Sequence, residues 1–327
     1  MTDSETAAGG ARAAPRYTGV RTFAALAHRP LAQLDWDAAR PAAAIVGVPF
    51  DTATSWRTGA RFGPEAIRSA SSLLRPWHPV HRVEVLRADT VIDAGDIAVT
   101  PGNAQRTSEQ IAAALAPACA AGAVPIVLGG DHSIALGELR AHAAARGPLA
   151  LVLLDAHADT WEEYYGERLF HGTVVRRAAE EGLIEPGRSL IAGIRGPLYA
   201  PEDLEQARAL GFELLTTDEL REISPQGFAA RVRERVAGAP AFLGLDIDVI
   251  DPCAAPGTGT PEVGGLLGGE AIALLRALAG VRFAGFDIVE VCPPYDSAAQ
   301  LTALLAANLA FEMLALAALA GSPAAGR

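Results

Sequence analysis

From Pro41 onward, short runs rich in valine, isoleucine and leucine alternate along the chain with segments of helical character. The apolar runs are nearly continuous, which is typical of parallel strands buried on both faces of a sheet. This alternation predicts one doubly wound α/β domain. The expected strands are Ala43–Val48, Val124–Leu128, Leu149–Asp155, Ser189–Ile194, Ala241–Asp246 and Arg282–Ile288. The expected helices are Ala104–Ala120, Ile134–Ala145, Pro201–Leu210, Gly269–Ala279 and Leu301–Ala320.

The 327 residues leave room for one large domain or two smaller ones, but no Ser/Gly-rich linker divides them. We therefore expect an N-terminal arm at residues 1–38, one catalytic domain at 39–321 and a tail at 322–327. The first fifteen residues lack the apolar core of a signal peptide. Three widely spaced cysteines, Cys119, Cys253 and Cys292, form no CxxC pair, so we expect a reduced, cytoplasmic protein.

The charge balance excludes some partners. Lysine and arginine total 27 and aspartate and glutamate 38, a formal net charge of −11, which disfavours binding to nucleic acid or to an anionic membrane. The apolar stretch Leu301–Ala320 carries Asn308 and Glu312 near its middle. We interpret it as a packed helix rather than a membrane span, which needs about 20 apolar residues with few or no charges.

Acidic and imidazole side chains follow four of the expected strands. The segments at these strand ends are Gly129–Ser133, Asp155–Asp159 and Asp246–Pro252, and the fourth strand leads to Glu290. Ligands of open parallel sheets bind beyond the carboxyl ends of the strands. These residues are therefore expected to form one acidic pocket that carries imidazoles.

The spacing of these residues predicts a metal site. Asp155, His157 and Asp159 follow one another at every second position, so an extended segment turns all three to one side. Four converging carboxylates repel one another, and two divalent cations would balance them. Too few ligands are present for two separate shells, so carboxylates must bridge ions about 3.5–4 Å apart that activate a water molecule. The candidate ligands are His132, Asp155, His157, Asp159, Asp246 and Asp248.

The types of ligand narrow the choice of metal ion but do not identify it. Carboxylates favour Mn²⁺ or Mg²⁺, and two imidazoles without a thiolate shift the preference to Mn²⁺, with Co²⁺, Ni²⁺ or Zn²⁺ as alternatives. Asp131 and Asp251 belong either to this pocket or to helix N-caps, since an aspartate after a strand commonly caps the next helix. The remaining histidines are expected to be packing or surface residues: His28, His78, His81 and His142.

Three segments resemble the signatures of the ureohydrolase family, which includes arginase, agmatinase and guanidino-acid hydrolases. They are GGDHS (129–133), DAHAD (155–159) and DIDVIDP (246–252). Further blocks are similar to the family at 57–68, 256–265 and 286–296, and the PGTGTP and HGT segments are nearest the agmatinase and guanidino-acid hydrolase branch. The resemblance implies a single three-layer α/β domain with a mostly parallel sheet of about eight strands, of the arginase/deacetylase type. It also implies a binuclear manganese enzyme that hydrolyses a guanidinium group to urea and an amine.

Carried over by motif, the resemblance gives each residue a role. One ion would be held by His132, Asp155, Asp159 and Asp246, and the other by Asp155, His157, Asp246 and Asp248, so that two Mn²⁺ per chain share Asp155 and Asp246. His171, in the HGT segment, would protonate the departing amine, as a group titrating near neutral pH can. Glu290 matches the guanidinium-binding glutamate. The family also suggests a homo-oligomer, a trimer or a hexamer.

Two positions depart from the family pattern. Gly244 stands where relatives often have serine, and Val174–Val175 replaces a pair that is commonly Pro-Phe. Neither position supplies a ligand, so these departures bear on the shape of the pocket. For both His171 and Glu290 a structural role, as a capping loop residue or a strand-end ion pair, is the alternative.

The substrate is the open question. The loop Thr160–Glu167 carries Trp161, Glu162 and Glu163 as candidate substrate-binding residues beside Glu290. A negative rim attracts a terminal ammonium, which favours agmatine over 4-guanidinobutyrate. The alternative is a loop that faces solvent. Arg57 or Arg61 at the entrance, if not engaged in inter-subunit ion pairs, would reverse the preference. A guanidino acid or a larger guanidino natural product is the alternative substrate. A metal-binding pseudoenzyme or a single-zinc deacetylase fits less well, because the six-ligand set, His171 and Glu290 are all present.

Overall fold

The computed structural model describes residues 15, 18–39, 41–87 and 89–321. The expected C-terminal tail at 322–327 and residues 1–14, 16 and 17 of the expected arm lie outside them. Within the described part of the arm, Phe23 is fully buried. The boundary at residue 38 stays a prediction.

An eight-stranded sheet forms the middle layer, with the strand order β4-β1-β5-β10-β9-β6-β7-β8. Every neighbouring pair is parallel. The strands are β1 (Ala43–Gly47), β4 (Val91–Asp96), β5 (Val124–Leu128), β6 (Ala150–Leu154), β7 (Leu190–Ile194), β8 (Glu213–Thr216), β9 (Ala241–Asp246) and β10 (Phe283–Val289). The single α/β domain with a parallel sheet is thereby confirmed.

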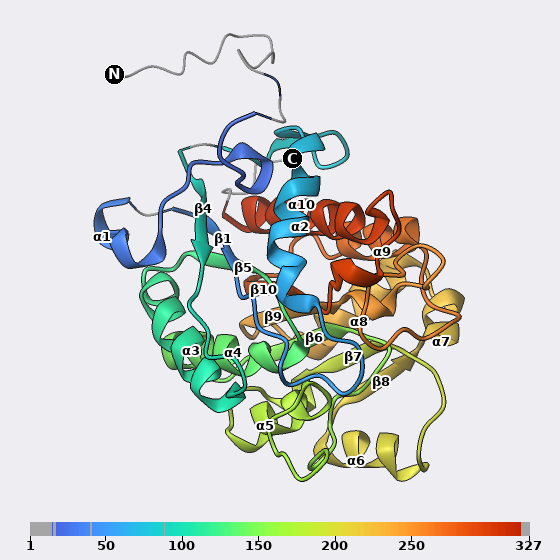
Figure 1. The fold of residues 1–327 in the computed structure, drawn as a ribbon. Helices are drawn as coiled ribbons and strands as arrows, with labels where there is room; N and C mark the ends of the chain where they lie inside the picture. The colour runs from blue at the N-terminus through green and yellow to red at the C-terminus, as the bar shows by residue number, and fades with distance from the viewer. Residues whose placement is uncertain (1–14, 16–17, 40, 88, 322–327) are drawn as a thin grey trace, which may run out of the picture.

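Helices cover both faces of this sheet (Figure 1). One face carries α2 (Gly63–Ala70), α8 (Pro225–Val236), α9 (Gly268–Ala277) and α10 (Leu301–Gly321), which pack on one another and on the sheet. The other face carries α3 (Ala104–Ala120), α4 (Ala135–Arg146) and α5 (Val174–Glu180). The shorter elements are α1 (Trp36–Ala39), α6 (Glu202–Leu210), α7 (Thr217–Glu222) and the hairpin β2 (Trp77–His78) with β3 (Val83–Glu84).

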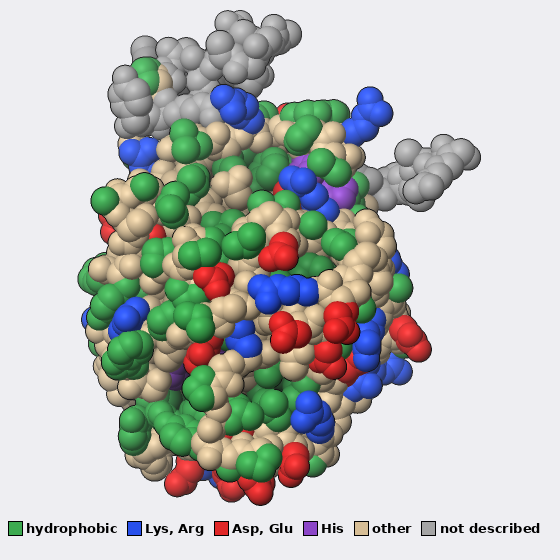
Figure 2. All heavy atoms as spheres, turned by 90° about the vertical axis from the view of Figure 1, so that its right-hand side faces the viewer, with side chains coloured by type: hydrophobic (Ala, Val, Ile, Leu, Met, Phe, Trp, Pro, Cys, Tyr) green, Lys and Arg blue, Asp and Glu red, His purple; other side chains and the backbone are tan. Residues whose placement is uncertain are grey.

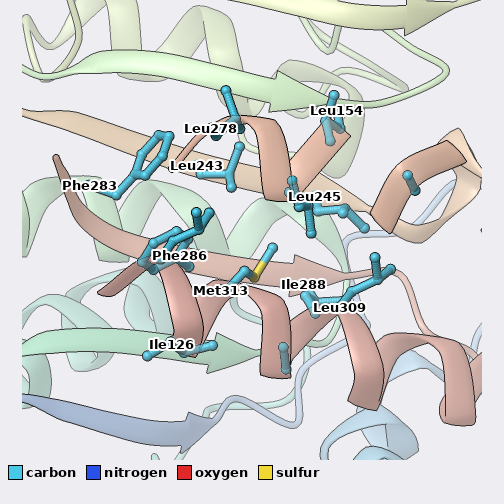
Figure 3. Close-up of a cluster of buried hydrophobic side chains, with 14 of the residues drawn as sticks. Ile126, Leu154, Leu243, Leu245, Leu278, Phe283, Phe286, Ile288, Leu309 and Met313 are labelled. Atoms are coloured by element: carbon cyan, nitrogen blue, oxygen red, sulfur yellow. The ribbon is translucent and has the colours of Figure 1, made fainter. Parts of the chain in front are cut away.

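Burial of the central strands on both faces explains their apolar sequences. Figure 3 shows Leu309 and Met313 of α10 directed toward Phe286 and Ile288 of β10. By length and composition, Leu301–Ala320 would suffice to cross a membrane, but 56% of its most apolar window is buried inside the protein. The packing of this helix in the core agrees with the sequence interpretation.

Candidate metal centre

The four strands whose ends carry acidic or imidazole side chains are the four central neighbours of the sheet, β5, β10, β9 and β6. His132 follows β5, Asp155 follows β6 directly, Asp246 is the last residue of β9, and Glu290 follows β10 directly. Because all four strands run parallel, their carboxyl ends meet at one edge. The structure brings the predicted residues together there.

The first group of ligand atoms surrounds the His132 ring. Its Nδ1 lies 2.8 Å from Asp159 Oδ2, 3.2 Å from Asp155 Oδ2 and 3.7 Å from Asp246 Oδ2. His132, Asp155 and Asp159 offer ligand atoms that all lie within 4.8 Å of one another. These four side chains are the ones assigned to one ion on the basis of the motifs.

The second group adjoins the first through Asp155. His157 Nδ1 lies 3.0 Å from Asp248 Oδ2 and 3.6 Å from Asp155 Oδ1. His157, Asp155 and Asp248 likewise offer ligand atoms within 4.8 Å of one another. Asp155 is therefore common to both groups, which is what a bridging carboxylate requires.

The electrostatics of the cluster fit two cations. Burial raises the pKa of Asp246 well above its usual range, and the charges of Asp248 and Asp155 raise it further. Within this cluster of candidate ligands, His132 Nδ1 and Asp155 Oδ2 are buried without a hydrogen-bond partner. Buried carboxylates and imidazoles in this state are suited to metal coordination, which supplies the missing partner for each lone pair.

Two residues at the site hold a backbone conformation that side chains rarely adopt. Asp159 has φ of 50° and Glu290 has φ of 61°, both in the left-handed region. Such conformations cost about 1–3 kcal/mol for non-glycine residues and persist where surrounding structure enforces them, often at functional sites. The strained positions are thus a candidate ligand and the glutamate beside it.

His171 lies next to the cluster, held between Glu290 and Ser55. Its Nδ1 is 2.9 Å from Glu290 Oε1, while its Nε2 accepts a hydrogen bond from the Ser55 N–H and lies 2.8 Å from Ser55 Oγ. Nε2 as acceptor leaves the ring proton on Nδ1, donated to Glu290. Burial lowers the pKa of His171, but the hydrogen bond and charge of Glu290 outweigh it and raise this pKa overall. Ser55 was not predicted from the sequence.

Glu290 also contacts the backbone of the candidate ligand His132. Its Oε1 accepts a hydrogen bond from the backbone N–H of His132 at 3.0 Å, and its Oε2 is buried without a partner. A Cβ at Gly259 would lie 3.2 Å from this free oxygen, so glycine keeps the approach to it open. Glu290 lies behind His171 and does not line the cavity, described next, that opens over the cluster.

A cavity of about 440 Å³ opens over the cluster. His157, Asp159, His171 and Asp246 lie in its floor and walls. An aromatic wall forms its outer part: the Trp161 ring stacks on Tyr164 with centroids 4.9 Å apart and lies 5.7 Å from Tyr199. The cavity is large enough for a small organic substrate.

The glutamates of the 160–167 loop do not form the expected negative rim. Trp161 lines the cavity, whereas Glu162 and Glu163 are exposed and do not line it. The stacking of Trp161 on Tyr164 turns the aromatic side chains inward and leaves the glutamates in solvent. The acidic residues that do line the outer cavity are Asp203 and Glu262, which the sequence reasoning missed.

One basic residue lines the cavity, and it was also missed. Arg195 follows β7 directly, so the rule that strand ends carry site residues would have found it. Its Nε, Nη1 and Nη2 contact backbone carbonyls of segments 193, 248–250 and 262–263. The Arg195 guanidinium therefore ties the end of β7 to two segments that follow β9.

Four further residues whose roles the sequence left open contact neighbouring groups of the same chain. Asp131 accepts hydrogen bonds from the N–H groups of Ala53 and Ser133, and Asp251 from those of residues 253, 264 and 265. Arg61 pairs with the buried Asp51, and Arg57 lies over the rings of residues 56 and 295. None of the four lines the cavity.

Comparison with known proteins gives a consistent result. A family model described as "Arginase family" matches residues 41–315. The chain is 41% identical to proclavaminate amidinohydrolase of Streptomyces clavuligerus over 92% of its own length and 94% of that protein's. It is 41% identical to guanidinobutyrase of Pseudomonas aeruginosa, with 92% and 93% covered, and 42% identical to agmatinase of Photorhabdus laumondii, with 83% and 86% covered. The solved structure of the Streptomyces enzyme superposes with a TM-score of 0.86 at 40% identity, covering 94% of this chain and all (100%) of that one.

Proposed function

This chain belongs to the arginase family and is an amidinohydrolase acting on guanidino C–N bonds, and from that premise we propose that it works with two Mn²⁺ ions on a small guanidino substrate. The observation that carries the proposal is the pair of ligand groups that share Asp155 beneath the main cavity. Two such ions lower the pKa of a water molecule and polarise the group it attacks.

The proposed ligand sets are those of the motifs. His132, Asp155, Asp159 and Asp246 would hold one ion, and Asp155, His157, Asp246 and Asp248 the other. Four aspartate charges balance two divalent cations, and the mixture of carboxylate and imidazole without thiolate favours manganese. The contacts of 2.8–3.7 Å between these side chains support the assignment.

His171 would supply the proton that the departing amine takes up. An imidazole titrates close enough to neutral pH to carry this proton, and Ser55 and His171 both border the cavity. Glu290 would orient His171 through Nδ1. The guanidinium contact that the motif assigns to Glu290 would need its Oε2, which is buried and unpaired behind His171, to become accessible from the cavity.

For the far end of the substrate we propose a cation, as in agmatine. The faces of Trp161 and Tyr164 attract a positive charge, and Asp203 and Glu262 add negative charge nearby. Arg195 opposes this with one positive charge, but its donors are engaged by backbone carbonyls and are not free to bind a carboxylate. The negative character first attributed to Glu162 and Glu163 would therefore come from other residues.

A guanidino acid is the second candidate. Two relatives with about 40% identity are named guanidinobutyrase and guanidinopropionase, and the cavity of about 440 Å³ would also admit a bulkier substrate. In this case the charge of Arg195 would outweigh that of Asp203 and Glu262.

Urea release from agmatine, arginine, 4-guanidinobutyrate and 3-guanidinopropionate with added Mn²⁺ tests the proposal. We expect the highest kcat/KM for agmatine, and we expect Trp161→Leu to lower it by roughly 2- to 30-fold, the range of one cation–π contact. The matched control is Trp77→Leu, since Trp77 is exposed in the β2 strand away from the cavity. A higher kcat/KM for 4-guanidinobutyrate would reject the cationic substrate, and no hydrolysis of any compound would point to a larger guanidino substrate.

The setting of the enzyme is part of the proposal. We propose a cytoplasmic homo-oligomer, a trimer or a hexamer, without nucleic-acid or membrane partners. Among the described residues the three cysteines are free, and on the face shown in Figure 2 acidic and basic side chains are interspersed rather than gathered into a basic patch. Light scattering after size-exclusion chromatography measures the oligomeric state.

A further inference from the structure

A second, very small cavity lies behind the metal centre, on the side away from the main cavity. Its volume is about 10 Å³, about that needed for one water molecule. His132, Gly244 and Asp287 border it, and the remaining walls are apolar side chains of α4, α5 and the sheet. Both positions that depart from the family pattern, Gly244 and the pair Val174–Val175, line this small cavity rather than the substrate cavity.

Carboxylate oxygens at this place have no partner. Asp287 Oδ1 accepts a hydrogen bond from the N–H of Leu245 at 3.1 Å, but its Oδ2 is buried and unpaired. Both carboxylate oxygens of Glu138, in α4, are also buried and unpaired. Burial raises the pKa of Glu138 well above its usual range, and the charge of Asp287 raises it further. Buried polar groups left without partners are costly, so this arrangement needs an explanation.

The orientation of the His132 ring explains why an unpaired carboxylate oxygen lies here. Its Nδ1 faces Asp155 and Asp159, so Nε2 lies on the opposite edge of the ring, and His132 borders the small cavity. Histidines that ligate metals almost always donate their second ring N–H to a carboxylate, a carbonyl or a water molecule. Such a partner fixes the tautomer in which the metal-facing nitrogen carries the lone pair.

Gly244 makes room for the contact. It pairs with Asp287 across β9 and β10, and a Cβ at this position would lie 3.2 Å from Asp287 Oδ1 and 3.0 Å from Leu153 Cδ1. A side chain at residue 244 would therefore reach into the space between Asp287 and the neighbouring strand. Glycine leaves that space to solvent.

We propose that one buried water molecule in this cavity links His132 Nε2–H to Asp287 Oδ2, and that Asp287 is thereby a positioning residue for the metal ligand His132. The inference rests on the proposed metal centre and goes beyond it, since neither Asp287 nor Glu138 is a candidate ligand. In this view Asp287 acts through His132 and touches neither metal nor substrate.

Mn²⁺ affinity, measured by competition with a fluorescent chelator, tests the proposal without any activity assay. Asp287→Asn keeps an oxygen for the Leu245 N–H but removes the charge, and we expect a 10- to 100-fold weaker Mn²⁺ Kd for the site that contains His132. Circular dichroism of the metal-free variant verifies that the fold is retained.

Residue 244 provides a matched pair of variants. Gly244→Ser and Gly244→Ala introduce the same Cβ, but only serine adds a hydroxyl that can replace the water between His132 and Asp287. We expect serine to keep the wild-type Kd and alanine to weaken it as Asp287→Asn does. Equal Kd values for serine and alanine, or an unchanged Kd in Asp287→Asn, would overturn the proposal. Failure of the wild-type chain to bind two Mn²⁺ would instead reject the metal centre itself.

Discussion

Among the described residues, two clusters combine histidine with carboxylate, and they differ in how their polar atoms are bonded. One is the metal centre around His132 and Asp155. The other, which we call the hairpin cluster, comprises His78, His81 and Glu312, where the β2–β3 hairpin meets α10. Each offers three ligand atoms within 4.8 Å of one another, so proximity alone does not distinguish them.

In the hairpin cluster, both ring nitrogens of the fully buried His78 are hydrogen-bonded. His78 Nδ1 accepts a hydrogen bond from the His81 N–H at 3.0 Å, so the ring proton is on Nε2, which donates to Glu312 Oε2 at 2.8 Å. Arg276 donates to Glu312 Oε1 and supplies the balancing positive charge. A cation here would break these bonds and meet an arginine. His81 Nε2 is buried without a partner here too, so the two clusters differ in their carboxylates. The metal centre has an excess of carboxylates, one of them with an unpaired oxygen at Asp155 Oδ2, whereas both oxygens of Glu312 are bonded. This difference separates a candidate metal site from an ion-pair network.

The largest effect is expected from Asp155→Asn, because Asp155 belongs to both ligand groups. A catalytic metal ion supplies several kcal/mol of transition-state stabilisation, so we expect kcat to fall by roughly 10³-fold or more. Metal analysis should show fewer than two Mn²⁺ per chain. Asp248→Asn, which touches one group, should cost less activity. One ion per fully active wild-type chain would reject the binuclear centre.

The next test compares a histidine of each region. His171→Asn should lower turnover by about 10²- to 10⁴-fold, the usual contribution of a positioned proton donor, and leave the metal content intact. His81→Asn, in the hairpin cluster, should leave both turnover and metal content unchanged. Urea release and metal analysis on the two variants decide the matter. Normal turnover in His171→Asn would return this residue to a structural role.

The hairpin cluster should matter for stability instead. Glu312→Gln leaves Arg276 without its counter-ion, and losing one member of a buried ion pair costs about 3 kcal/mol in the free energy of unfolding. Because the side chain of Arg276 is 35% exposed, solvent offsets part of that cost. Urea denaturation measures the loss, and Mn²⁺ content should stay at the wild-type level. A loss of bound metal without a loss of stability would show that the hairpin cluster binds metal after all.

The sequence predicts the centre of the sheet better than its edges. The six expected strands are the six inner ones, whose burial on both faces requires continuous apolar runs. The sequence analysis did not predict the two edge strands. Strand β4 carries two aspartates and a glycine, and β8 has four residues, of which only one is buried. The apolar pattern weakens wherever one side of a strand faces solvent.

The same contrast holds for the sites. Strand ends in a parallel sheet must converge, so His132, Asp155 and Asp246 could be placed from the sequence. The direction of Glu162 and Glu163 depends on how aromatic rings stack in the loop, and no local pattern encodes that. The hairpin cluster joins residues 234 positions apart through helix packing, which is equally invisible to motif and spacing.

A third kind of histidine sharpens the comparison, since His142 is buried with no carboxylate bonded to it. Its Nδ1 lies 3.4 Å from the Sγ of Cys119, and burial, with a smaller contribution from the charge of Arg146, lowers the pKa of His142 to about 3. In the unfolded chain a histidine titrates near about 6.5. Between these two values the unfolded state binds one more proton than the folded state, so this residue makes stability fall as the pH is lowered.

We therefore expect His142→Gln to flatten the acid limb of the stability curve. The wild-type free energy of unfolding, relative to the variant, should fall by about 1.4 kcal/mol per pH unit below about pH 6.5 and level off near pH 3. Urea denaturation of both proteins at several pH values gives this difference, in which the contributions of the other titrating groups cancel. The variant is less stable at neutral pH if the cavity is poorly refilled, but only the slope is diagnostic. Parallel curves would mean that the pKa of His142 is not lowered in the folded protein. A buried imidazolium without a carboxylate would then be tolerated beside Cys119.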